Sequence, residues 1–219
     1  MLEVDDIEAA SVCLKAYREA GEELFGFFNS GEHSGASQPH RHIQFLPVES
    51  MRSGIRSDEG WSILAHRLAE KPGTYIELFH KRHVLTAEVM PFMYFWSGIS
   101  EGLTAQQRHS IYIALHGKAV QAMGGPNVVS SNENGSPISY NLAITNQCMV
   151  LCPRTSEGLV IKNKKGESIG PVALNGTMLA GTLLVKSEAE WNTLRKDESK
   201  LEDILSCIGI SSIKKDTQI

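Results

Sequence analysis

The chain has 219 residues, and 21 lysines and arginines stand against 25 aspartates and glutamates, so its formal net charge is −4. This length suits one large or two small domains, and the composition is typical of a soluble globular protein. The negative charge argues against a protein that coats nucleic acid. The longest apolar run, residues 89–96, has eight residues, whereas a membrane span needs about 20.

Cysteine usage and the N-terminal residues bear on the compartment. The first ten residues are acidic and contain no basic segment followed by an apolar run, unlike a secretory signal or a transit peptide. Of the four cysteines, only Cys148 and Cys152 are close in sequence. Since no second Cys or His pair completes a metal-binding spacing, we expect core thiols and no metal site. Sparse thiols fit a reducing cytosol, which predicts a cytoplasmic protein.

In the first half of the chain, apolar periodicity predicts a helix over residues 5–20 and a strand over 24–28. A polar loop and an alternating strand over 40–48 follow. A helical stripe covers residues 61–68 and ends near Pro72, and residues 75–95 are typical of one or two strands. Thr104 is a candidate N-cap for a helix that runs to residue 123.

After a turn-rich connector at residues 130–137, the sequence changes to short segments that alternate or run apolar in the manner of strands. A final helix should start at Ser187, with Glu190 at the spacing of a capping box. Together the two halves predict an α+β fold, with an antiparallel sheet and helices packed on one face. The strands expected in this half are residues 140–145, 149–153, 159–162 and 178–185, with a polar turn at 163–168.

One segment carries residues suited to chemistry: NSGEHSGASQPHRHIQF, residues 29–45. On a strand, His40, His42 and Gln44 would project from the same face. A Gly/Ser-rich loop just before them can turn backbone N–H groups inward and form an anion-binding nest. A neutral imidazole attacking phosphorus, beside donors that hold the phosphoryl oxygens, fits this composition. The segment therefore predicts phosphoryl or nucleotidyl transfer.

Two other interpretations of the histidine pair stay open on the residues alone. A His-x-His pair can bind zinc, with a third ligand from His80 or His83. The pair could also be a coincidence of packing. The zinc interpretation does not explain why glycine, serine, asparagine and glutamine gather immediately upstream.

The segment His40-Arg41-His42-Ile43-Gln44 resembles the His-x-His-x-Gln signature of the transferase branch of the histidine-triad superfamily. With residues 29–31 and 34–38, it is most similar to fungal-type diadenosine tetraphosphate (Ap4A) phosphorylases, also called ATP adenylyltransferases. Residues 139–146, 152–154 and 174–186 are similar to the C-terminal segment of that family, in the same order. The resemblance spans roughly residues 25–190. It implies a histidine-triad-like sheet, with a catalytic domain over 1–129 and an adenylyltransferase segment over 130–219 on the same sheet.

The resemblance also implies a mechanism and its residues. His42 would attack an α-phosphorus of Ap4A, expel ATP and hold AMP, and inorganic phosphate would then take the AMP to give ADP. His40 would orient His42, and Gln44 would hold a phosphoryl oxygen. The positions implied to bind substrate are Asn29, Gly35, Ala36, Ser37, Gln38, Asn175, Gly176, Thr177, Thr182 and Lys186.

Several expectations about partners and alternatives follow. A divalent cation such as Mg²⁺ should accompany the nucleotide, with no tightly bound cofactor and no nucleic-acid or membrane partner. Family members carry a section before the helix that opens this chain, so we expect a sheet that is incomplete at its N-terminal side. A hexose-phosphate uridylyltransferase relative is a second reading, although such proteins typically place proline where this chain has Arg41. A non-catalytic nucleotide-binding remnant is a third.

Overall fold

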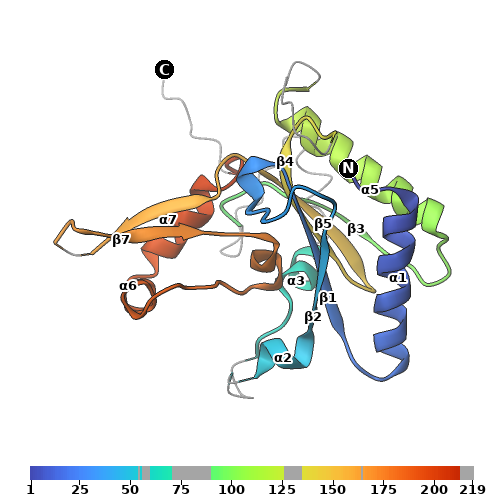
Figure 1. Cartoon of the computed structure of the whole chain (residues 1–219), viewed down its shortest axis with the longest axis horizontal. Helices are drawn as coiled ribbons and strands as arrows, with labels where there is room; N and C mark the ends of the chain where they lie inside the picture. Colours follow the sequence, from blue (N-terminus) through green and yellow to red (C-terminus); the bar gives the residue numbers. More distant parts are fainter. Residues whose placement is uncertain (54, 56–59, 71–89, 126–134, 164, 213–219) are drawn as a thin grey trace.

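The computed structural model describes residues 1–53, 55, 60–70, 90–125, 135–163 and 165–212 (Figure 1). Within these residues, five strands form an antiparallel sheet in the order β2-β1-β4-β5-β3, and β6 and β7 form a separate hairpin. The predicted antiparallel α+β fold is therefore confirmed. The strands are β1 (Leu24–Ser30), β2 (Ile43–Pro47), β3 (Phe95–Gly98), β4 (Ser139–Ile144), β5 (Cys148–Arg154), β6 (Gly158–Lys162) and β7 (Ser168–Ala173).

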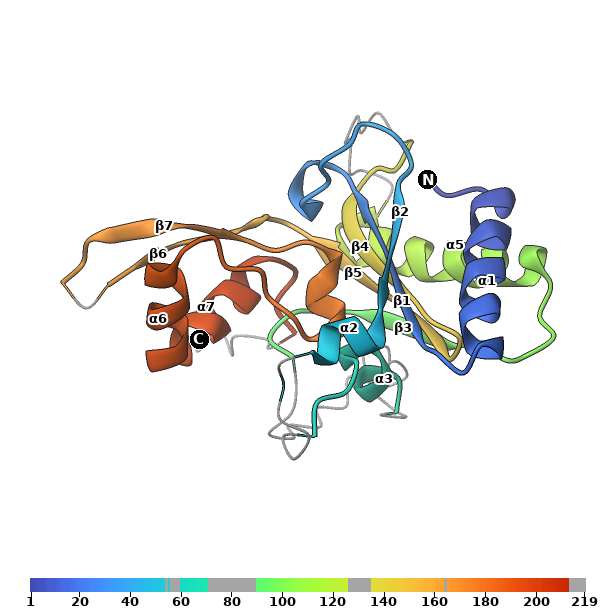
Figure 2. The ribbon, with the colours of Figure 1, turned by 60° about the horizontal axis from the view of Figure 1, so that its bottom comes forward.

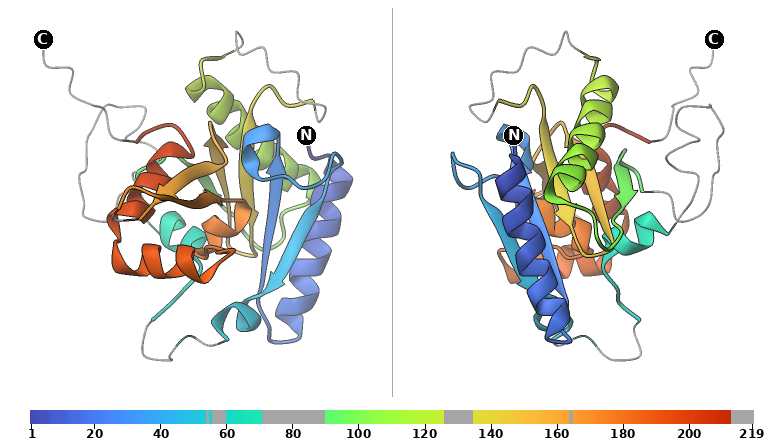
Figure 3. Two further views of the ribbon diagram at one scale, coloured as in Figure 1. Left: turned by 60° about the vertical axis from the view of Figure 1, so that its left-hand side comes forward. Right: turned by 90° about the vertical axis from the view of Figure 1, so that its right-hand side faces the viewer.

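Two long helices, α1 (Val4–Glu19) and α5 (Ala105–Ala122), lie side by side on one face of the sheet (Figure 3). Their buried side chains, among them Leu14 and Leu115, pack with Phe28 of β1 in one apolar cluster. Each helix begins where expected. Thr104 accepts a hydrogen bond from the backbone N–H of Gln107, whose side chain binds back to the N–H of Thr104, which is a complete capping box.

Shorter elements, short helices among them, cover the other face of the sheet and form a second apolar cluster, so helices lie on both faces and not on one as predicted. The β6–β7 hairpin extends away from the sheet, and two helices lie along it (Figure 2). The core thus continues from the sheet under the hairpin. The short helices of this face and of the hairpin are α3 (Leu64–Ala69), the 3₁₀ helix η3 (Gly176–Ala180), α6 (Glu188–Lys196) and α7 (Ser199–Cys207). In chain order, the 3₁₀ helix η1 (Glu32–Ser34) comes before β2 and α2 (Val48–Arg52) comes directly after it.

Two predicted elements of the second half differ in the structure. The strand expected over 178–185 is absent, because the Asn175 side chain caps η3 and Gly181 ends it in the left-handed region. Buried apolar runs of this length do not distinguish a strand from a helical turn. The partner of β6 is instead β7. The final helix is two helices, separated at Asp197, whose backbone is extended (φ −150°, ψ 90°). Most of the strands expected over 75–95, with His80 and His83, lies outside the described residues.

The cysteine prediction is confirmed for the close pair. All four cysteines are free thiols, and Cys148 and Cys152 are buried in the core. Burial raises the pKa of the Cys148 thiol to about 11 and that of Cys152 to about 12. Both side chains are therefore neutral packing groups. In the part of the chain that the structure describes, no helix is long and apolar enough to cross a membrane.

Candidate functional site

Strand β2 is an edge strand, and its register determines which face Gln44 occupies. Gln44 pairs with Phe27 of β1, and Ile43 pairs with Phe28. Directly opposed residues of an antiparallel pair project from the same face. Ile43 packs with Phe28 in the cluster under α1 and α5, so Gln44 lies on the opposite face, with Phe27 and η3.

The two motif histidines lie just before this strand. The predicted strand over 40–48 begins only at Ile43, because β1 pairs with β2 up to Phe28 and then continues beside β4 alone. His40 and His42 are both exposed. Their ring centroids are 5.8 Å apart, with an edge-to-face interplanar angle of 86°. The two rings are therefore neighbours in a solvent-accessible loop.

Arg41, between the two histidines, ties this loop to the start of α1. Its guanidinium forms ion pairs with Glu3 and, at 3.3 Å, with Asp6. The hydrogen bond to Glu3 and the nearby carboxylates raise the pKa of Arg41. Since these acidic residues lie at the N-terminus of α1, Arg41 points toward that helix.

The Gly/Ser loop packs against a segment far away in the sequence. Gly35 has a left-handed backbone (φ 72°), and a Cβ there would lie 2.9 Å from the Leu174 carbonyl oxygen and 2.9 Å from Asn175 Cβ. Only glycine fits both the conformation and the close approach. The buried Ser34 hydroxyl donates to the Gly31 carbonyl at 2.7 Å. Of the following residues, Ala36 is half-buried, and Ser37 and Gln38 are exposed.

Hydrogen bonds connect Asn29 to the same distant segment. Asn29 Oδ1 accepts from the backbone N–H of Gly176 at 2.8 Å. Asn175 Oδ1 accepts from the N–H and the hydroxyl of Thr177, at 3.0 and 2.8 Å. The Thr182 hydroxyl donates to the Thr177 carbonyl at 3.1 Å. The structure therefore brings Asn29, the Gly35 turn and residues 175–182 together.

Within the described residues, no hydrogen bond joins Lys186 to this group. Its side chain is exposed, and its backbone N–H donates to the Glu190 carboxylate at 2.6 Å. Ser187 caps α6 through the N–H of Glu190, as predicted. The second half of that capping box is shifted by one residue, because the Glu190 carboxylate binds Lys186 and not Ser187.

Two buried residues beneath the group were not among the predicted site residues. Arg154 is fully buried in β5, and Asn141 is fully buried in β4. Asn141 Nδ2 donates to Asn29 Oδ1 and to the Ser34 carbonyl, both at 2.8 Å. The Arg154 guanidinium donates to Asn141 Oδ1 and to the carbonyl oxygens of Ile208, Ser156, Glu157 and Leu174.

Burial lowers the pKa of Arg154, yet a guanidinium with acceptors on every side stays protonated. The available signal was a lone arginine at the end of the apolar strand segment 148–153. Charged residues are rarely buried without partners, so that position could have been predicted to hold a polar cluster.

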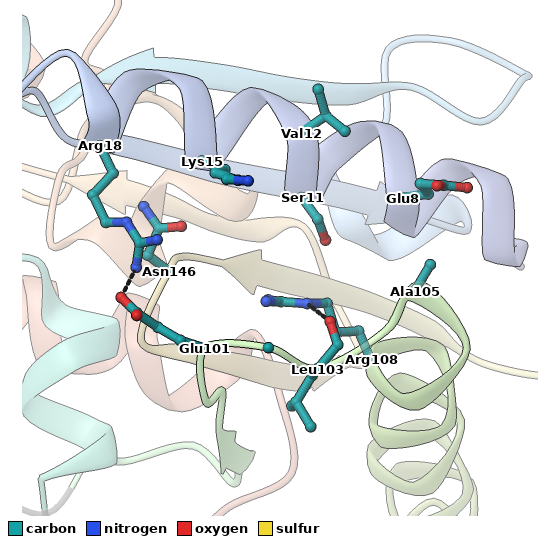
Figure 4. A pocket seen from close by; sticks show the side chains of 11 residues that line it. Glu8, Ser11, Val12, Lys15, Arg18, Glu101, Leu103, Ala105, Arg108 and Asn146 are labelled. Atoms are coloured by element: carbon teal, nitrogen blue, oxygen red, sulfur yellow. Dashed lines mark hydrogen bonds and ion pairs between the residues drawn. The ribbon is translucent and has the colours of Figure 1, made fainter.

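A cavity of about 460 Å³ lies on the other side of the sheet, between α1 and the start of α5 (Figure 4). An ion pair between Arg18 and Glu101 borders it, and Arg108 Nε donates to the Leu103 carbonyl at 3.2 Å. None of the predicted site residues lines this cavity. It is therefore distinct from the group around Asn29.

Two family models match this chain. The family model of the Ap4A phosphorylase N-terminal domain matches residues 1–57, and that of the ATP adenylyltransferase C-terminal domain matches residues 88–211. The search of curated proteins gave no match.

Solved structures of a yeast protein share the fold. Yeast Ap4A phosphorylase Apa2 in complex with AMP has a TM-score of 0.68 and 19% identity, over 99% of this chain and 65% of that chain. Apa2 in complex with Ap4A has a TM-score of 0.64 and 18% identity, over 96% and 64%. This chain spans less than two thirds of the length of these relatives. Because the C-terminal model covers more than half of the chain, the protein belongs to the ATP adenylyltransferase family.

Proposed function

We propose that this protein is a nucleotidyltransferase that cleaves Ap4A with inorganic phosphate, giving ADP and ATP, through an adenylyl group held on His42. The observation that carries the proposal is the contact between two segments 147 residues apart in sequence: Gly176 N–H donates to Asn29 Oδ1 at 2.8 Å. One segment leads into the His-x-His-x-Gln motif, and the other belongs to the C-terminal family domain. Membership of the family and the fold of an Ap4A phosphorylase support the same function.

In the first half-reaction, a ring nitrogen of neutral His42 donates its electron pair to an α-phosphorus of Ap4A. The bond from that phosphorus to the polyphosphate oxygen breaks, and ATP leaves. A polyphosphate is a weak base and departs without a proton donor, which suits a glutamine at the third motif position. Gln44 donates a hydrogen bond to a non-bridging oxygen, and the neighbouring ring of His40, 5.8 Å away, orients His42.

In the second half-reaction, an oxygen of inorganic phosphate attacks the same phosphorus. The nitrogen–phosphorus bond breaks, ADP leaves, and the imidazole becomes neutral again. Donors around the loop hold the phosphoryl oxygens throughout. The residues proposed to bind substrate remain Asn29, the run 35–38, Asn175, Gly176, Thr177, Thr182 and Lys186.

A divalent cation such as Mg²⁺ would reach the site through the polyphosphate oxygens of the substrate. Among the described residues, no group of three or more His, Cys, Asp or Glu side chains gathers as a metal site. Such a cation would be held chiefly by phosphate oxygens and water. We also propose a cytoplasmic location and no nucleic-acid or membrane partner, in line with the formal charge of −4.

A time course of ADP and ATP release from Ap4A, with and without inorganic phosphate, tests the proposal. The wild-type chain should release ADP, and ATP beyond one equivalent per chain, only when phosphate is present, and His42→Ala should lose this activity. His109→Gln is a matched control, because His109 lies on α5, on the face of the sheet opposite to Gln44, where its ring forms a hydrogen bond with the Leu2 carbonyl. Binding of Ap4A without phosphate-dependent ADP release would contradict the proposal and favour a nucleotide-binding role.

A further inference from the structure

One buried asparagine side chain, that of Asn141, connects Arg154 to Asn29, and groups of fixed polarity determine how the amides of Asn141 and Asn29 are oriented. The Gly176 backbone N–H only donates, so the atom it meets on Asn29 is the oxygen. The Ser34 carbonyl only accepts, so the atom of Asn141 that meets it is the nitrogen. The Arg154 guanidinium only donates, which places Asn141 Oδ1 toward it.

The consequence appears at Asn29. Its Oδ1 accepts two hydrogen bonds, from Gly176 N–H and Asn141 Nδ2, both at 2.8 Å. Within the described residues no hydrogen bond is found for its Nδ2, and the residue is half-buried. The NH₂ group is therefore the end of the amide that remains available to a ligand.

The orientation of this amide matters for a phosphate. Phosphate oxygens accept hydrogen bonds and repel a carbonyl oxygen. A reversed Asn29 would face them with Oδ1 and would set its own NH₂ against two donors. Asn141 and Gly176 therefore favour one orientation before any ligand binds, which is preorganisation of the kind that strengthens binding and catalysis.

We propose that Asn141, itself held by Arg154, is a positioning residue that keeps the NH₂ group of Asn29 directed at the phosphate oxygens of the nucleotide. This inference rests on the proposed function, since it takes Asn29 to contact the substrate. Asn141 is fully buried, so it acts through Asn29 and does not touch the nucleotide.

Titration of the purified full chain with AMP, by calorimetry, tests the inference. Asn141→Asp preserves size and the acceptor for Arg154, but its carboxylate cannot donate to Asn29 Oδ1. We expect AMP to bind at least about tenfold more weakly. Asn146→Asp is the matched control, because it loses one donor to a backbone carbonyl, that of Leu14 in α1, and should bind AMP as the wild type does.

A double mutant separates positioning from a general structural role. In an Asn29→Ala background, Asn141→Asp should weaken AMP binding by less than about threefold, because the amide that it orients is gone. An equal loss in both backgrounds, or no loss in either, would overturn the inference.

A second variant tests the inference without altering Asn141. Asn29→Asp keeps the anchored oxygen but turns a carboxylate oxygen toward the ligand, so AMP should bind more weakly to Asn29→Asp than to Asn29→Ala. Equal or tighter binding would refute the inference even if Asn141→Asp fails to fold. The AMP series is independent of turnover: a wild-type chain that binds AMP but releases no ADP refutes the proposed function alone, while one that binds no AMP refutes both.

Discussion

Gly176→Ala is the substitution whose effect the structure determines most closely. A Cβ at this position would lie 2.8 Å from Phe27 Cδ2, 2.9 Å from Asn29 Oδ1 and 3.0 Å from Phe27 Cβ. Phe27 is 2% exposed, and Asn29 is held by Asn141, so neither neighbour has room to retreat. The backbone φ of Gly176 is not positive, so the penalty comes from the contacts and not from the backbone.

Overpacking of this kind costs roughly 1–3 kcal/mol. For a chain of this size, each kcal/mol lowers Tm by about 2–4 °C. We therefore expect a Tm lower by roughly 2–12 °C. Because the same Cβ displaces the oxygen of Asn29, AMP binding should weaken as well.

The assays are thermal and urea denaturation together with AMP titration, and Gly117→Ala is the matched control. Gly117 lies inside α5, and a Cβ there would have nothing within 4 Å, so alanine should stabilise the protein by up to about 1 kcal/mol. If Gly176→Ala is as stable as Gly117→Ala and binds AMP normally, the close packing of η3 on β1 is refuted.

Three further predictions concern stability, each measured by urea denaturation. Gly35→Ala should lower the free energy of unfolding by at least about 2 kcal/mol, and by more than Gly21→Ala does. Both glycines have positive φ, but only at Gly35 would a Cβ lie 2.9 Å from a carbonyl oxygen. Equal effects would contradict that contact. Arg154→Met should lower the free energy of unfolding by at least about 3 kcal/mol, since it leaves buried acceptors unpaired. At the exposed Arg195, the same substitution should change it by less than about 0.5 kcal/mol. Similar effects of the two substitutions would contradict the buried network. Burial lowers the pKa of His116 to about 4, so as pH falls below about 6.5 this histidine takes up a proton in the unfolded chain before it does so in the folded one. The free energy of unfolding should therefore drop by up to roughly 3 kcal/mol between pH 6.5 and 4. His116→Gln should flatten this slope, and an unchanged slope would assign the acid sensitivity to other groups.

Elements with a clear period and a cap were predictable from the sequence. Helix α5 begins at its Thr104 cap, and α1 matches the predicted helix within one residue at each end. The alternation around Gln44 was also predictable, because Ile43 and Phe45 pack under α1 and α5 and Gln44 lies on the other face. Such features depend on local spacing, which the sequence contains.

Features that depend on distant partners were not predictable. The apolar run at Met178–Ala180 suits a strand equally well, and only the Asn175 cap and the packing on β1 select a 3₁₀ helix. The sequence places Arg154 at the end of a strand, yet the hydrogen-bond acceptors of its guanidinium include carbonyl oxygens 20 and 54 residues away. The orientation of the Asn29 amide follows from Asn141, 112 positions further along the chain.

The boundary predicted between residues 129 and 130 stays a prediction. Strands from both sides of it form the same sheet, because β1 pairs with β4 from Gly26 to Ser30. The two matched family domains likewise meet in this sheet, since the first supplies β1 and β2 and the second supplies β3, β4 and β5.

The central claim, an adenylyl group on His42, is tested most directly by mass spectrometry of the intact protein after mixing with Ap4A in the absence of phosphate. The wild-type chain should gain the mass of one adenylyl group, peptide mapping should place it on His42, and added phosphate should remove it as ADP. A protein that releases ADP and ATP without ever carrying the group, or that carries it on another residue, would contradict the account.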